Sequence, residues 1–272
     1  MRSSEPEDIL RDLGISDPAE IDIEAIAWYL GASVRIRPLH GCEALIVGTH
    51  NKAIITVNAA SSIERRRFSI AHELGHWMRH RGRAQLCRAV DIGRTGEADT
   101  NDIALREKVA DRYAADLLMP RYLFRPAIAQ IRHLTFAAIN ELARQFATSR
   151  TATAIRLIEA DIFPALIVCH GLSGRKWFVR APQVPNHWFP REDLDPDGFA
   201  IAVLYGEAGD CPMPRKVSAE SWFDVAGAER FEVREQTIRV ANNEILTLIL
   251  IDDEEMLEER NTISKFRKYR RW

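Results

Sequence analysis

The chain has 272 residues, of which 46% are hydrophobic and 28% charged, with 14 glycines and 12 prolines. This composition excludes a mainly disordered chain, a collagen and a small disulfide-held scaffold, and the length suffices for one or two domains with real cores. The formal net charge of −2 gives no overall field that would favour nucleic acid. We find no signal peptide, membrane-length apolar run or closely spaced cysteines, so we expect a reduced, cytoplasmic protein without a membrane partner.

The first 60 residues alternate between helical and strand-like patterns. Apolar spacing predicts helix within residues 5–31, ended by Gly31. Three β-branched runs, separated by turn residues, predict short strands at residues 33–37, 45–47 and 53–57. The third strand could bind a substrate peptide by β-addition, or it could be an ordinary internal strand.

Two long helices follow, with a polar loop between them. Ser61 and the glutamate three residues later form a capping box, which predicts a helix that runs to about His80. Residues 81–101 predict a loop. A second helix is expected to begin near Asn101 and to end at Met119, where a proline interrupts it.

The first of these helices carries the sequence His-Glu-Leu-Gly-His at residues 72–76. Residues i and i+4 of a helix share a face, so His72 and His76 can reach a single metal ion. Glu73 is then placed to take a proton from a water at the metal. The alternative is two surface histidines beside a surface glutamate. The apolar flanking residues argue against that alternative, because they place the helix inside the domain and buried histidines need partners.

A catalytic zinc takes three protein ligands and leaves one position open. The second helix offers Glu107 and Asp111, of which one could bind the metal while the other accepts a ring N–H of a ligating histidine. The alternative is a solvated acidic pair, which is mildly destabilising on a helix. His80 lies too far along the helix from His72 to share its ion, and it could instead face substrate or simply the surface. An oxyanion donor is also needed, for which His80 and Tyr113 are candidates, although Tyr113 could be a core residue.

Segments of both helices resemble a known family of proteins. Residues 67–76 (Arg-Phe-Ser-Ile-Ala-His-Glu-Leu-Gly-His) and 107–120 (Glu-Lys-Val-Ala-Asp-Arg-Tyr-Ala-Ala-Asp-Leu-Leu-Met-Pro) are similar to the ImmA/IrrE family of metallo-endopeptidases. That family pairs an HELGH helix with an E-x-x-A-[ND]-x-[FY]-A-A-x-L-L-M-P helix. The match is dense over residues 53–120. It departs at Val109, where glutamate is frequent, and at Asp111, where asparagine is common, but neither change removes a ligand.

The resemblance implies a zincin-like domain with His72, His76 and Glu107 as zinc ligands and Glu73 as the general base. Manganese is the alternative metal. The family resemblance also implies a protein substrate, a helix-turn-helix repressor of the Xre type that is often encoded nearby. Cleavage of that repressor would release stress-response or mobile-element genes.

The chain becomes helical and locally basic after the metal-site helices. Residues 136–146 and 150–159 fit a helix-turn-helix pair, with Ala147 at the position where glycine is usual in the turn. If this pair bound DNA, Arg150 and Arg156 would face the groove. The alternatives are a connector packed on the peptidase domain or a protein-docking surface.

A β-rich region is predicted after residue 163. Its aromatic and β-branched runs are residues 165–169, 177–180, 199–205, 231–240 and 245–251. Some members of the family carry a GAF-like sensor domain at this place, which is an analogy of fold alone. The predicted fold class is therefore α+β. Its three segments are a zincin-like metallopeptidase domain with a small sheet and two metal-bearing helices (1–130), a helix-turn-helix-like segment (131–162) and a β-rich C-terminal domain (163–272).

Two functions follow from these patterns. The first is a zinc-dependent, site-specific endopeptidase that acts on a repressor. The second is a DNA-binding regulator, or a component of a toxin–antitoxin pair, whose metal site is structural or vestigial.

Overall fold

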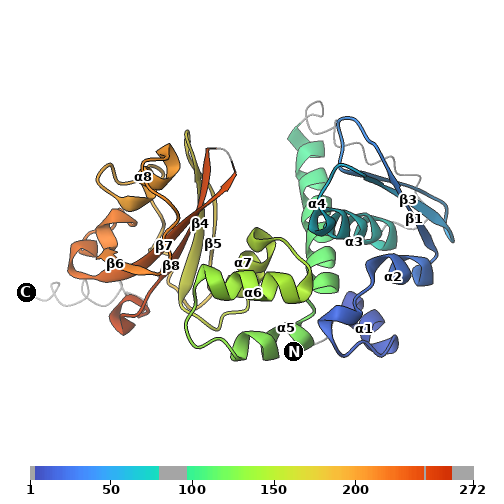
Figure 1. Ribbon diagram of the computed structural model, residues 1–272, viewed down its shortest axis with the longest axis horizontal. Coiled ribbons are helices and arrows are strands. Elements are labelled where there is room, and N and C mark those ends of the chain that lie inside the picture. The colour runs from blue at the N-terminus through green and yellow to red at the C-terminus, as the bar shows by residue number, and fades with distance from the viewer. Residues whose placement is uncertain (1–3, 80–96, 242, 259–272) are drawn as a thin grey trace, which may run out of the picture. The chain divides into compact units, whose positions relative to one another are not determined.

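The computed structural model divides the chain into two compact units (Figure 1). The residues that it describes are 4–79, 97–241 and 243–258. The two units consist of Met1–Arg132 with Ala138–Arg156, and of His133–Ala137 with Leu157–Trp272. This grouping differs from the predicted segments, because most of the helix-turn-helix-like segment 131–162 belongs to the first unit.

The chain through residue 159 is a mixed α+β structure. Its helices and strands are α1 (Glu5–Asp12), α2 (Ile23–Leu30), β1 (Ala32–Arg37), β2 (Ala44–Gly48), β3 (Ala53–Asn58), α3 (Ile63–Arg79), α4 (Glu97–Leu118), α5 (Arg121–Ala129), α6 (Phe136–Phe146) and α7 (Arg150–Glu159). The three predicted strands and the two long helices are confirmed. The second long helix starts at Glu97, earlier than the predicted residue 101.

Local chemistry fixes several helix ends. The Asp22 carboxylate accepts hydrogen bonds from the first N–H groups of α2, and Gly31 ends that helix with a left-handed φ of 99°. Ser62 Oγ accepts the N–H of Arg65 at 3.2 Å. The cap of α3 is therefore Ser62, one residue later than the predicted Ser61.

A three-stranded sheet of order β1-β3-β2 forms the first layer of this unit. The central strand β3 runs parallel to β1 and antiparallel to β2, with Ile55 opposite Val34 and Ile46. Both edges of β3 are thus occupied, so the predicted option of β-addition to residues 53–57 is wrong. Among the described strands of this sheet, β1 and β2 form the outer edges.

Helix α3 packs against this sheet and against α4 (Figure 1). Alternate residues of β3, Ala53, Ile55 and Val57, are buried, as expected for a strand with one face on a core. Ile70 and Leu74 of α3 are 2% and 0% exposed and belong to the same core. The sheet and α4 therefore hold α3 from two sides.

The α6–α7 pair has the helix bounds expected of a helix-turn-helix. Ala147 in the turn adopts a left-handed φ of 48°, and Ser149 Oγ accepts the N–H of Ala152 to cap α7. The expected DNA-facing role of Arg156 is wrong, because this side chain is buried and its guanidinium donates to Asp116 Oδ1 at 2.7 Å. Arg150 is half-buried.

The second unit is built on a five-stranded antiparallel sheet of order β5-β4-β8-β7-β6. Its elements are β4 (Ala165–Gly171), β5 (Gly174–Arg180), α8 (Phe199–Tyr205), β6 (Arg215–Ser218), β7 (Glu232–Ala241) and β8 (Glu244–Leu250). The β-rich character of this region is confirmed. Its GAF-like identity stays a prediction.

One run that was predicted as a strand is a helix. Residues 199–205 form α8, with Ala200, Val203 and Leu204 buried at a helical i, i+3, i+4 spacing. Gly206 ends α8 in the left-handed conformation with a φ of 84°. Among the described residues, no helix combines the length and the apolar character needed to span a bilayer.

Candidate metal centre

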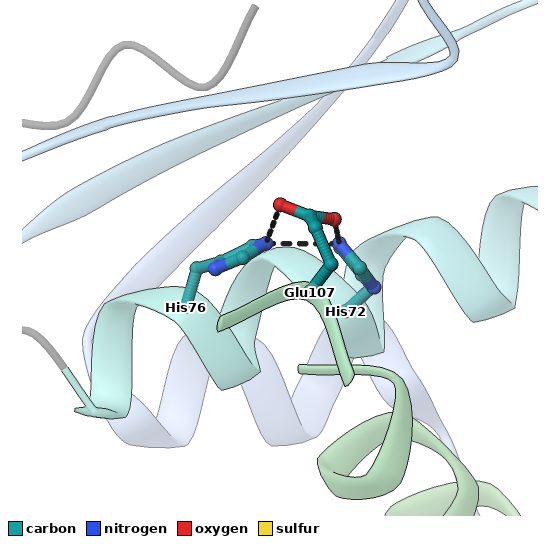
Figure 2. A group of neighbouring side chains, drawn as sticks. All are labelled: His72, His76 and Glu107. Atoms are coloured by element: carbon teal, nitrogen blue, oxygen red, sulfur yellow. Dashed lines mark hydrogen bonds and ion pairs between the residues drawn. The ribbon is translucent and has the colours of Figure 1, made fainter. Parts of the chain in front are cut away.

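Helix α3 presents its two motif histidines side by side. His72 and His76 are four residues apart, and their Nε2 atoms lie 2.9 Å from each other (Figure 2). The rings meet edge to face with centroids 4.6 Å apart. His76 is 4% exposed and His72 17%, so the pair lies at the boundary between core and solvent.

Helix α4 supplies the third donor from across the helix pair. Glu107 Oε2 lies 3.1 Å from His72 Nε2, and Glu107 Oε1 lies 3.3 Å from His76 Nε2 (Figure 2). The donor atoms of the three residues all lie within 4.8 Å of one another, so this group could hold a metal ion. Two imidazoles with one carboxylate are the ligand set of a known class of catalytic zinc site.

Asp111 fixes the orientation of one ring. His72 Nδ1 lies 2.9 Å from Asp111 Oδ1, so the proton on Nδ1 is donated to this carboxylate. In the neutral ring the Nε2 lone pair then faces the Glu107 carboxylate, which is repulsive unless a proton or a metal ion lies between them. The donor atoms of His72 and Glu107 are thus arranged as ligands of a metal ion would be.

The charges around His72 favour its protonated form when no metal is present. Burial lowers the pKa of His72, but the hydrogen bond to Asp111 and the negative charges of Asp111, Glu107 and Glu73 outweigh this effect, and the pKa is raised. A metal ion would replace that proton, since a ligating imidazole must be neutral on the bonding nitrogen.

Glu73 is a buried carboxyl group beside the three donors. It is 5% exposed, and its Oε2 has no hydrogen-bond partner among the described residues. Burial raises its pKa to about 7; the positive charge of His72 lowers it, and the charge of Glu107 raises it further. A carboxyl group with a pKa near 7 suits proton transfer at neutral pH.

The other predicted contacts are placed differently. Tyr113 is 2% exposed, and its Cβ and Cγ lie close to Gly75 of α3, so a direct contact between Tyr113 and substrate is disfavoured. His80 lies outside the described residues. Sequence reasoning missed Gly75, although an isolated glycine inside a helical pattern is a known sign of close packing.

Together, the small sheet and the two helices that share a His-His-Glu group define a zincin-like domain. Residues 27–158 match the sequence profile of the peptidase family M78, described as the IrrE N-terminal-like domain. This part of the chain is similar to that family, which confirms the predicted resemblance. The match reaches through α7, so it includes the helix pair that the sequence suggested as a separate segment.

Comparison with solved structures gives a second finding. A Mycobacterium tuberculosis transcriptional regulator is similar with a TM-score of 0.60 and 13% identity, over 94% of this chain and 90% of that chain. At this identity the likeness shows the fold alone. The comparison with curated protein sequences gives no match. The family supports a metallopeptidase or IrrE-like regulator role.

Proposed function

We propose that this chain is a zinc-dependent endopeptidase whose substrate is a helix-turn-helix repressor of the Xre type. Cleavage of the repressor would release stress-response or mobile-element genes in the cytoplasm. One observation carries the proposal: two imidazoles and a carboxylate from α3 and α4 converge beside the buried Glu73.

The chain's own residues can perform the proton steps of peptide hydrolysis. A bound zinc ion would supply a Lewis acid and lower the pKa of a bound water. Glu73 is placed to accept the proton of the attacking water and to pass it to the leaving amine. In the metal-free chain burial raises the pKa of Glu73 to about 7, which favours uptake of a proton, and the positive charge of a bound metal ion would favour its release. Asp111 holds the His72 ring with Nε2 toward Glu107.

An extended protein segment is the substrate form that the sheet supports. Strand β2 packs on α3 and forms one edge of the sheet, and it has the uncharged sequence Ala-Leu-Ile-Val-Gly. Edge strands that are kept from pairing usually carry charges or proline, which β2 lacks. A peptide could add to this edge through main-chain hydrogen bonds.

Metal content and peptide cleavage test the proposal together. The wild-type chain should contain about one zinc ion, by elemental analysis, and should cleave a helix-turn-helix repressor of the Xre type from the same organism. Glu107→Ala should lose the zinc and the cleavage. Glu73→Gln should keep the zinc and lose cleavage by about 1,000-fold or more, because the amide cannot accept the proton.

Glu64→Gln is the matched control, since Glu64 lies on the same helix about two turns before the site. It should keep both the metal and the cleavage. Full cleavage by Glu73→Gln would exclude Glu73 as the general base. A wild-type chain without affinity for zinc or manganese would overturn the proposed enzyme.

The regulator with a similar fold favours a second function, binding to DNA. Against it, two of the four α7 side chains that the helix-turn-helix pattern would place in the groove are buried, because Thr153 and Arg156 are 0% and 4% exposed. The other two, Arg150 and Thr151, are half-buried. DNA binding would be salt-dependent and would weaken in Arg150→Ala. If no duplex is retarded in a gel at low salt, this second function is excluded.

A further inference from the structure

Helices α3 and α4 are in close contact at a glycine inside the metal motif. A Cβ atom built on Gly75 would lie 2.9 Å from Tyr113 Cβ, 3.2 Å from Tyr113 Cγ and 3.2 Å from Ala110 Cα. Ordinary contacts of a Cβ atom begin at 3.4 Å. Any side chain at this position would therefore force the two helices apart.

This contact lies within the metal centre along both helices. Gly75 directly precedes His76 and follows His72 by three residues, while Ala110 follows Glu107 by three and directly precedes Asp111. At a rise of about 1.5 Å per residue, all four groups lie within about one helical turn of the contact. A change in helix separation at Gly75 is thus transmitted directly to the distance between the donors.

Glycine is, after proline, the least favourable residue in the interior of a helix. The chain nevertheless has one in the buried part of α3, between Leu74 and His76. Gly75 lies four residues before Arg79, the last residue of α3, which is one turn too early for a glycine that caps the end of the helix. The close approach to α4 explains it.

We propose that Gly75 is a positioning residue for the metal centre, which sets the separation of α3 and α4 so that Glu107 reaches both imidazoles. The proposal rests on the proposed metal site and goes beyond it. A methyl group at position 75 requires a displacement of about 0.5 Å to bring its shortest contact from 2.9 Å to 3.4 Å. Metal–ligand distances tolerate only about 0.2 Å. The displacement therefore exceeds what the site can absorb without losing a bond.

A purely structural role predicts a different result. If Gly75 served packing alone, Gly75→Ala would change the stability of the fold and leave the properties of the bound metal unchanged in the folded protein. If it positions α4, the folded variant will bind metal more weakly and with altered geometry. Metal affinity and the cobalt(II) absorption spectrum separate these cases, because the spectrum reports the ligand geometry and not the stability.

The test compares zinc affinity by chelator competition, and the cobalt(II) spectrum, in full-length variants. We expect Gly75→Ala to bind zinc about 10- to 100-fold more weakly than wild type and to shift the cobalt bands, as changes that misorient metal ligands do. Gly209→Ala is the matched control, since a Cβ there meets nothing within 4 Å. It should match the wild type in both measurements.

A second variant approaches the same contact from the other helix. Ala110→Ser adds one atom at a position that is 1% exposed, and it should also weaken zinc binding if the helix separation matters. It decides the question if Gly75→Ala does not fold. A folded variant of either kind with wild-type zinc affinity and cobalt spectrum overturns the proposal. A wild-type chain that binds no zinc is a separate outcome, which overturns the proposed function as well.

Discussion

Two buried glutamates each carry a carboxylate oxygen without a hydrogen-bond partner in the described part of the chain. Glu73 lies beside the three metal donors, and Glu235 lies on β7 of the second unit with 3% exposure. A buried unpaired oxygen is costly for folding, so each needs a reason. For Glu73 the reason is its proposed role as the general base. Glu235 has a partial one, since its Oε2 accepts the Trp222 indole N–H at 2.7 Å.

Glu235 makes the stability of the second unit depend on pH. Burial raises the pKa of Glu235, and the hydrogen bond from Trp222 and the charge of Arg215 offset this only in part. The folded chain therefore keeps a proton in a pH range where the unfolded chain has lost it. The free energy of unfolding should fall as the pH rises from about 4.5, the ordinary pKa, through the raised pKa of the folded state.

Glu235→Gln tests this dependence. The amide oxygen can still accept the indole N–H of Trp222, and it carries no charge at any pH. We expect the variant to gain about 1 kcal/mol over wild type at pH 7 and to lose the part of the pH dependence that Glu235 contributes above its ordinary pKa, measured by urea denaturation at several pH values. The exposed Glu232→Gln, three residues earlier on the same strand, should leave the pH dependence unchanged. If the free energy of unfolding depends on pH as steeply in Glu235→Gln as in the wild type, other groups cause that dependence.

Asp111 orients the His72 ring, which a cluster of charges without metal binding would not require. Its carboxylate accepts His72 Nδ1–H at 2.9 Å, which directs Nε2 toward Glu107. Asp111→Ala should therefore weaken zinc binding by about 10- to 100-fold, measured by chelator competition. Asp111→Asn keeps an acceptor oxygen, so its zinc affinity should fall less than that of Asp111→Ala. Equal zinc affinity in all three proteins would contradict the orienting role.

At the level of the elements, the α6–α7 pair supports the end of the helix that carries Glu107. Arg156 of α7 donates to Asp116 Oδ1 at 2.7 Å and to the Met119 carbonyl at 2.9 Å, which is where α4 ends. The turn of the pair accepts a hydrogen bond at the Ala147 carbonyl from Arg67 of α3, at 3.2 Å. The pair thus contacts both helices of the metal centre.

Arg156→Met should destabilise the first unit by about 3 kcal/mol, because it leaves the buried Asp116 without its closest cation. The loss should be measured as a lower urea midpoint. Arg144→Met is the control on α6, where the side chain is 74% exposed and its partner Glu141 lies on the surface. That change should stay within about 0.5 kcal/mol. An equal loss of stability in the two variants would contradict the proposed stabilisation of the first unit by Arg156.

The same two helices explain how much could be predicted from sequence. His72 and His76 were identified because helical periodicity fixes which residues share a face over a few turns. The same periodicity offered both Glu107 and Asp111, and the family resemblance selected Glu107 as the ligand. The role of Arg156 was mistaken because its partner Asp116 lies 40 residues away, and a local pattern does not encode a distant contact. The helical state of α8 was missed, and the choice between an internal and a peptide-binding strand at β3 stayed open, for the same reason, since strand order and burial depend on tertiary packing.

At the scale of the whole molecule, the three metal donors and most of the family match fall in the first unit, while the second unit has its own sheet and core. A ligand that binds only the folded first unit stabilises that unit by mass action. Calorimetry should therefore resolve two unfolding transitions, and zinc should raise the midpoint temperature of the first unit's transition alone.

The expected shift follows from the binding free energy. Zinc at about 100 times its dissociation constant adds about 2.7 kcal/mol. For a unit of about 150 residues this raises the unfolding temperature by about 5 to 10 °C. A chelator should reverse the shift, and Glu107→Ala should abolish it, because that variant lacks the third donor. Glu235→Gln should move the other transition, since Glu235 belongs to the second unit. A zinc shift that appears equally in both transitions, or that survives Glu107→Ala, would show that the metal binds elsewhere than between α3 and α4.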